Sequence, residues 1–147
     1  MATYYDIHPK FHVAVDCIIF GFNKDGLSLL LLKRNMEPFF GAWSLMGGFV
    51  QNDESVDNAA KRVLREYTGL NEVYMEQVGT FGAVHREPEE RVISVAYYAL
   101  INIQDYDKKC VEEHNGYWAR IDELPHLLFD HEEMIEKARE QMRRKAS

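Results

Sequence analysis

The sequence of 147 residues predicts one α/β domain, a sandwich in which helices cover both faces of a mixed β-sheet. Three observations lead to this prediction. Several segments are rich in β-branched and aromatic residues, and two segments have helical periodicity. The helical segments are separated by groups of strands, some joined by hairpins, which gives the predicted fold an α+β character.

The first half of the chain begins with strands. Residues 12–22 form a predicted buried strand, because VAV and CIIF are β-branched and aromatic. The dipeptide Asp25-Gly26 favours a hairpin turn, so residues 27–32 are expected to return as a second strand. Residues 45–50 form a short third strand that contains glycine.

A helix is predicted over residues 55–67. Its apolar residues recur at intervals of three and four, which is the spacing of one helix face. These residues are Val56, Ala59, Ala60, Val63, Leu64 and Tyr67. Gly69 follows as a typical helix stop.

The second half of the chain predicts more strands and a closing helix. Strands are expected at 73–84, 92–103 and 116–120, with the charged loop 85–91 between the first two. The final helix is predicted over 131–144. Its acidic start and basic end suit the helix dipole.

Composition narrows the classes of protein. The formal net charge is −7, whereas a domain that grips nucleic acid is normally basic. The apolar runs are too short to span a bilayer, and the first residues lack the pattern of a secretory signal. Cys17 and Cys110 have no metal-type spacing. These features favour a cytoplasmic protein that contacts no membrane.

Residues 43–70 carry the most specific pattern, and they resemble the Nudix signature. That signature is Gly, five residues, Glu, seven residues, Arg-Glu, an aliphatic, any residue, Glu-Glu, any residue, Gly and an aliphatic. The chain agrees at seven of the nine defined positions, which are Gly48, Glu54, Arg62, Leu64, Glu66, Gly69 and Leu70. Residues 118–125 are similar to the family's WxRIDELP-like ending. The resemblance implies a Nudix fold for residues 1–147.

Two positions of the signature helix depart from the family. The three glutamates of the family's signature helix share one helix face at i, i+3 and i+4. The resemblance implies that they bind magnesium. Here those positions hold Val63, Glu66 and Tyr67. Only Glu66 could ligate a hard cation, and it is a weak metal candidate because a lone carboxylate is a poor site. We therefore expect hydrolysis to be absent or very weak.

The retained signature residues also have structural interpretations. Gly48 can serve a turn with positive φ or a close backbone approach. Glu54 and Arg62 can form an ion pair that fixes the loop against the helix. Glu66 can be a lone ligand or a salt-bridge partner, and Tyr67 favours packing.

The whole chain resembles the N-terminal domain of Nudix-related bacterial transcription regulators, which include the arabinose-responsive AraR and the NrtR regulators. DCIIFGF, LLLLKRN and HNGYWARIDELP carry this resemblance. It implies an effector-binding domain that acts as a homodimer. DNA contact would come only from a C-terminal winged-helix domain, which residues 1–147 do not contain.

The leading functional hypothesis is a ligand-sensing domain for a sugar such as L-arabinose, with no cofactor. A sugar pocket needs convergent polar groups and an apolar wall. The candidate ligand-binding residues are Arg34, Glu54, Glu66, Tyr67, Arg86 and Arg91. The alternative is a Nudix hydrolase that cleaves a nucleoside diphosphate linked to another group, such as ADP-ribose. It would use magnesium, with Glu54 and Glu66 as catalytic candidates. A third hypothesis is a purely structural dimerisation domain.

Overall fold

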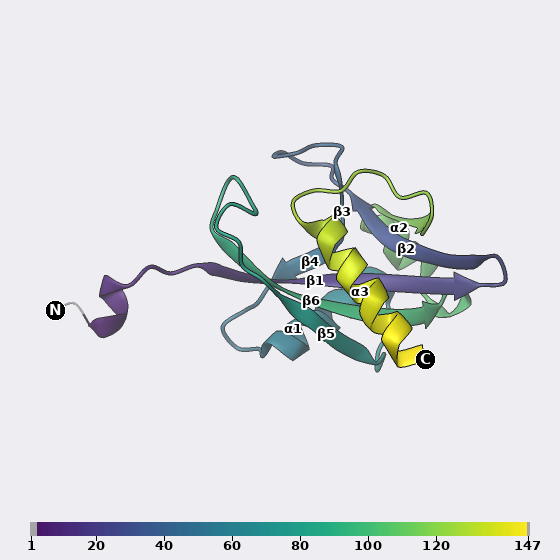
Figure 1. Cartoon of the computed structure of the whole chain (residues 1–147), viewed down its shortest axis with the longest axis horizontal. Helices are drawn as coiled ribbons and strands as arrows, with labels where there is room; N and C mark the ends of the chain where they lie inside the picture. The colour runs from purple at the N-terminus through teal and green to yellow at the C-terminus, as the bar shows by residue number, and fades with distance from the viewer. Residues whose placement is uncertain (1–2, 147) are drawn as a thin grey trace.

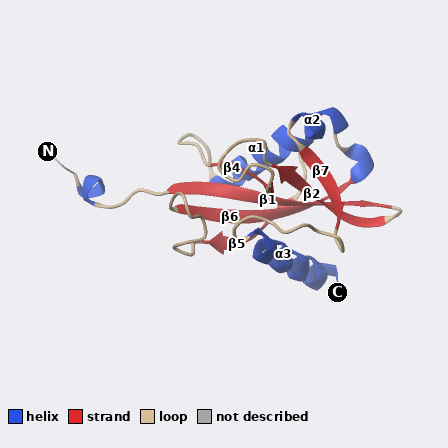
Figure 2. Cartoon of the chain, turned by 90° about the horizontal axis from the view of Figure 1, so that it is seen from above, coloured by secondary structure: helices blue, strands red, loops and turns tan. Residues whose placement is uncertain are grey.

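A computed structural model describes residues 3–146. A seven-stranded sheet lies between helices on its two faces (Figures 1 and 2). The strands are β1 (His12–Asn23), β2 (Gly26–Lys33), β3 (Trp43–Ser44), β4 (Met46–Phe49), β5 (Met75–Phe81), β6 (Val92–Asn102) and β7 (Gly116–Arg120). The helices are α1 (Val56–Thr68), α2 (Lys108–Glu113) and α3 (His131–Ala146), with 3-10 turns at Tyr4–Ile7 and Ile103–Asp105.

Strand β1 is the centre of the sheet. The main strand order is β3-β2-β1-β6-β5, with β4 added on β1 and β7 on β2. β1 and β6 run parallel over eleven residue pairs, from His12–Val92 to Phe22–Asn102. The pairs of β1 with β2 and with β4 are antiparallel. The mixed sheet of the predicted Nudix sandwich is therefore confirmed.

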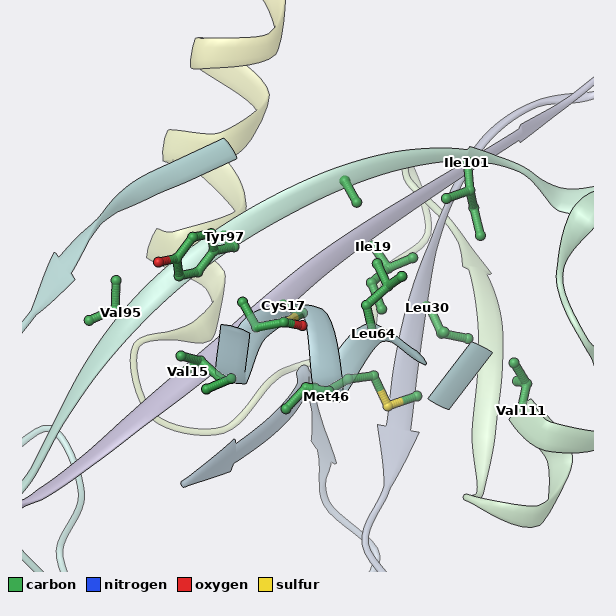
Figure 3. Close-up of a cluster of buried hydrophobic side chains, with 14 residues drawn as sticks. Val15, Cys17, Ile19, Leu30, Met46, Leu64, Val95, Tyr97, Ile101 and Val111 are labelled. Atoms are coloured by element: carbon green, nitrogen blue, oxygen red, sulfur yellow. The ribbon is translucent and has the colours of Figure 1, made fainter. Parts of the chain in front are cut away.

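The two faces of the sheet carry separate apolar layers, because successive side chains of a strand point to opposite faces. Val15 and Cys17 of β1 pack with Leu64 on the side of α1 and α2 (Figure 3). Ile18 and Phe20 belong to the layer beneath α3. Figure 2 shows α1 and α2 on one side of the sheet and α3 on the other.

Helix α1 forms where its periodicity predicts it. The Ser55 hydroxyl accepts a hydrogen bond from the amide of Asn58 at 3.1 Å, which is an ordinary N-cap. Gly69 ends the helix in the left-handed conformation with φ of 76°, which costs glycine no side-chain clash. The predicted bounds of 55–67 are one residue early.

Other elements differ from the prediction. Strand β5 is shorter than residues 73–84, and the predicted strand 45–50 is replaced by β3 and β4, interrupted at Leu45. Helix α2 was not predicted, because six residues are too few to show a period. Asp107 caps it by accepting a hydrogen bond from the amide of Cys110 at 3.2 Å. Within residues 3–146, no helix is long and apolar enough to cross a membrane.

Candidate ligand-binding site

A cavity of about 230 Å³ opens between β1, β4 and the start of α3. Asp16, Ser44 and His131 contribute polar groups to its lining, and Phe49, Tyr67 and Phe129 contribute aromatic rings. Arg34 and Glu87 add one charge of each sign. The cavity therefore combines an apolar wall with convergent polar groups, which is typical of small-molecule sites.

A glycine pair brings β4 close to the floor of the cavity. A Cβ atom on Gly47 would lie 2.6 Å from the Asp16 carboxylate and 2.8 Å from the Val15 carbonyl oxygen, so no side chain fits there. A Cβ atom on Gly48 would lie 3.1 Å from the Val63 side chain and 4.0 Å from that of Arg62. Gly48 belongs to a strand and is not among the residues with positive φ. The proposed turn role of Gly48 is therefore wrong, whereas the close-approach role agrees with its contact.

Asp16 is a buried carboxylate within the apolar segment VAVDCIIF of β1, so it requires polar partners. The Ser94 hydroxyl donates a hydrogen bond to it at 2.6 Å. The Nε2 atom of His131 lies 3.5 Å from its other oxygen. The Leu45 amide donates to Nδ1 of His131 at 3.2 Å. The proton of a neutral His131 therefore resides on Nε2, facing Asp16.

Arg86 joins the β5–β6 loop to the start of α3 through hydrogen bonds. Its side chain is 2% exposed, and its guanidinium donates to the Asp130 carboxylate at 2.8, 3.0 and 3.2 Å. The guanidinium of Arg86 also lies 2.9 Å from the Glu87 carboxylate and 3.9 Å from the Asp16 carboxylate. Burial lowers the pKa of Arg86, but these carboxylates outweigh burial and raise it. Three carboxylates surround one guanidinium, so the cluster has a formal charge of −2 when His131 is neutral.

The signature carboxylates lie outside this cavity lining. Arg62 holds Glu54 through two hydrogen bonds of 2.8 and 3.0 Å and contacts Glu66 at 3.3 Å. The hydrogen bond from Arg62 lowers the pKa of Glu54. Arg62 also donates to the Phe49 carbonyl oxygen at 2.9 Å, which fixes the loop against α1. These contacts agree with the structural interpretation of the Glu54–Arg62 pair.

The residues at the family's metal positions do not fit magnesium. Val63 is fully buried in the core beneath Gly48. Glu66 is exposed. Tyr67 is half-buried and lines the cavity, and the centroid of its ring lies 4.9 Å from that of the His114 ring. Among residues 3–146, no three His, Cys, Asp or Glu side chains are grouped to hold a metal ion.

Three of the six predicted ligand-binding residues lie at or beside the cavity, and three lie away from it. Arg34 and Tyr67 line the cavity, and Arg86 contacts it through Asp16. Glu54 and Glu66 are engaged by Arg62. Arg91 donates to the carbonyl oxygens of Gly82 and Ala83, and it does not line the cavity.

Sequence reasoning missed Asp16, Glu87 and His131. A single aspartate within the apolar segment VAVDCIIF was a usable indication, because a buried charge requires a partner. His131 had no such indication, since a histidine at the start of a surface helix is commonly exposed.

Comparison with known proteins places these features in a family. The chain is 32% identical over 135 residues to the ADPR responsive transcriptional repressor NtrR of Acinetobacter baylyi, which matches 89% of this chain. It spans 54% of that repressor's length. It is 35% identical over 130 residues to the ADP-ribose pyrophosphatase of Methanocaldococcus jannaschii, covering 88% of this chain and 72% of that protein.

A solved structure shows the same fold. The NrtR protein of Shewanella oneidensis, crystallised with a 27mer DNA, superposes with a TM-score of 0.81 at 33% identity. The match covers 91% of this chain and 63% of that one. Residues 10–142 match the model of the NUDIX domain. The chain therefore belongs to the NUDIX domain family.

Proposed function

We propose that this domain senses a small neutral polyhydroxyl ligand, with L-arabinose as the favoured example, and that it has lost pyrophosphate hydrolysis. One observation carries the proposal: the cavity is small and has an acidic floor, while Arg62 engages Glu54 and Glu66 outside it. The ligand would bind without a metal ion or another cofactor.

The size and charge of the cavity favour a neutral ligand. Its volume of about 230 Å³ is below the ~300–1,000 Å³ of sites for drug-sized molecules. Asp16 and Glu87 are acceptors that suit sugar hydroxyls. A diphosphate would instead need a metal ion, several arginines or backbone amides. Arg34 is the only arginine or lysine among the described lining residues.

We further infer that residues 1–147 are the effector domain of a longer transcription regulator. The chain covers only about half of the repressor that it resembles. Its net charge of −7 disfavours direct contact with DNA. A C-terminal winged-helix domain would make that contact, and ligand binding to the NUDIX domain would regulate it.

The second candidate ligand is ADP-ribose. One relative is an ADPR-responsive repressor and another is an ADP-ribose pyrophosphatase, which favours this candidate independently of the cavity. If the domain were a hydrolase of this kind, it would require magnesium. Glu54 and Glu66 would then have to leave Arg62 to become ligands or catalytic groups.

A thermal-shift series followed by calorimetry separates the candidates. A ligand that binds only the folded state raises the melting temperature once the ligand concentration exceeds the dissociation constant. Millimolar L-arabinose should raise it, whereas ADP-ribose, with or without magnesium, should not. Tyr67→Phe in the cavity should weaken arabinose binding, and the control Glu66→Gln outside it should not. A shift with ADP-ribose alone would overturn the sugar proposal.

Phosphate release tests the loss of hydrolysis separately. With ADP-ribose and magnesium, turnover should remain at background, because the helix lacks its carboxylate cluster. A rate of about one per second or faster, within the usual enzyme range, would show an active hydrolase.

A further inference from the structure

A groove follows helix α1 on the side where that helix faces the start of β5 (Figure 1). It consists of two adjoining hollows of about 970 and 470 Å³, which share Lys61 and Met75. Along the helix the groove extends from Asp57 to Arg65. None of the described residues lines both this groove and the cavity beside Asp16, so the two are separate sites.

The floor of the groove is apolar. It is formed by residues that also belong to the core beneath α1, namely Leu64, Leu70, Val73 and Met75. Leu64 is buried, and the other three are partly buried. The ring of Tyr74, which is 71% exposed, stands at the rim. Such a floor can cover apolar side chains of a partner, while the rim remains in contact with water.

Two cations at the border of the groove have no partner within residues 3–146. Lys61 and Arg65 are exposed, and neither side chain makes an ion pair or a hydrogen bond there. They lie one helical turn apart, and like charges at i and i+4 slightly disfavour a helix. Asp57, one turn before Lys61, does not neutralise it, because the Asp57 carboxylate accepts a hydrogen bond from Tyr97. Both cations are therefore available to an anionic partner.

The acidic residues of the groove do not cancel these cations. Glu72 is the only acidic residue among the described lining residues of the larger hollow, which gives that lining a formal charge of +1. The smaller hollow adds Asp57 and Glu76. The Glu76 carboxylate lies 2.6 Å from Nζ of Lys145, so it is already paired.

Strand β5 forms the second wall of the groove and is the last strand on its side of the sheet. Among the described strands it pairs only with β6, and the register shifts between Gln77 and Gly79. A Cβ atom on Gly79 would meet no other atom within 4 Å. Gln141 donates to the Gln77 carbonyl oxygen at 3.2 Å, which caps the edge at one residue without a strand. An open edge offers amide and carbonyl groups to another extended chain.

We propose that this groove binds an extended acidic peptide segment of another protein, with two carboxylates at alternate positions and apolar residues beside them. In an extended chain, residues i and i+2 point to the same side and lie about 6.6 Å apart. Lys61 and Arg65 are separated by about 6 Å along the helix axis. A Glu-X-Glu pattern therefore matches the two cations, and apolar residues two positions before and after it lie over the floor.

The extent of the groove favours a peptide over a small anion. The larger hollow alone reaches the upper end of the ~300–1,000 Å³ of small-molecule sites, and the smaller hollow continues it along α1. A small anion would leave the backbone of β5 unused. The net charge of −7 repels an acidic peptide at long range. At physiological ionic strength, however, the Debye length is only about 8 Å, so the cations at the groove dominate there.

Fluorescence polarisation with the full 147-residue chain tests the proposal. The probe is the fluorescein-labelled peptide Leu-Ser-Glu-Ser-Glu-Ser-Leu, which places both leucines and both glutamates on one side. It should bind saturably with a dissociation constant below about 0.3 mM. The double variant Lys61→Gln, Arg65→Gln should raise this constant at least about tenfold, because both ion pairs with the probe are lost.

A matched variant separates the groove from overall charge. Lys109→Gln with Arg120→Gln removes two exposed cations elsewhere on the chain. Each double variant removes two positive charges, so the formal net charge changes from −7 to −9 in both. The matched variant should bind the probe as the wild type does, and both variants should keep the circular dichroism spectrum of the wild type. A probe with glutamine in place of both glutamates should bind the wild type at least about tenfold more weakly.

Four results would overturn the proposal. The wild type could fail to bind the probe saturably, or the two double variants could weaken binding equally. Sodium octanoate could displace the probe at the concentration at which unlabelled peptide does, which would assign the groove to small amphiphilic anions. Millimolar L-arabinose could displace the probe, which would show that the groove and the cavity are not separate. Failure of arabinose to bind the cavity would leave the peptide result unaffected.

Discussion

The Nε2 atom of His131 lies 3.5 Å from the Oδ1 atom of Asp16, which joins the first residue of the last helix to the centre of the first strand. His131 also accepts a hydrogen bond from the Leu45 amide. One histidine thus connects β1, the segment between β3 and β4, and α3 at the cavity wall. A ligand that displaced either contact would alter the position of the start of α3.

Asp16→Asn should weaken both the fold and ligand binding. Ser94, His131 and Arg86 would face an amide in place of a carboxylate, which should cost about 1–3 kcal/mol of unfolding free energy. L-Arabinose affinity should fall at least about tenfold, equivalent to 1.4 kcal/mol. Urea unfolding and calorimetry measure the two effects. Asp25→Asn, in the exposed β1–β2 turn, is the control and should change neither by a measurable amount.

The neighbouring glycines of β4 should respond differently to one methyl group. Gly47→Ala places its Cβ against the backbone oxygen of Val15, which cannot withdraw, so the variant should lose about 1–3 kcal/mol of stability. Gly48→Ala meets the movable side chain of Val63 and should lose less. Chemical denaturation of the matched pair measures the difference. Equal losses would show that the close approach to Asp16 and Val15 does not limit packing.

Arg86→Met should cost about 3–5 kcal/mol, because it removes the cation that pairs with the partly buried Asp130 and faces the buried Asp16. The matched control is Arg120→Met, whose arginine is exposed and contacts Asp122 at 3.5 Å. Such a surface change usually alters stability by less than about 0.5 kcal/mol. Guanidinium unfolding should separate the two variants clearly.

The hydroxyl of Tyr97 should make stability sensitive to alkaline pH. Burial and the hydrogen bond that Tyr97 donates to Asp57 raise the pKa of Tyr97 from 10.0 to about 12. The unfolded chain loses this proton first, so the contribution is complete below pH 10 and is lost as the pH rises toward 12. Over this interval the wild type should lose stability more steeply than Tyr97→Phe. Parallel slopes in pH-dependent melting curves would contradict this assignment.

Reinstating a glutamate at position 63 should damage the fold before it restores a metal site. Val63 is fully buried, so Val63→Glu should cost about 3–5 kcal/mol as an uncompensated buried charge. Lys61→Glu, at an exposed position of the same helix, is the control. Thermal melts with and without magnesium measure both effects. A Val63→Glu variant that is stable and is further stabilised by magnesium would show that this position can still serve a metal.

Local patterns predicted most of the fold. The helical period before Gly69 located α1 to within one residue, and Asp25-Gly26 located the hairpin between β1 and β2. Helix α2 was missed because it is a single short element, capped by Asp107 and packed near Gly69. Its formation depends on tertiary contacts, which the helix propensities of single residues do not describe.

The site was harder to predict because its residues are distant in the sequence. Tyr67 was found through the signature helix, whereas Asp16 meets Ser94 across 78 residues and His131 meets Leu45 across 86 residues. No local spacing relates these positions. The signature itself directed attention to Glu54 and Glu66, which the fold uses to hold Arg62.

The parallel pairing of β1 with β6 also constrains how the chain is made. His12 pairs with Val92, 80 residues later, and such non-local contacts slow folding. At synthesis rates of about 5–20 residues per second, β1 waits roughly 4–16 s on the ribosome for the start of its partner. Until then its apolar residues can be covered by β2, β4 and the α1 segment, but not by β6. Chains arrested before residue 92 should therefore bind holdase chaperones, and release should begin once β6 has emerged.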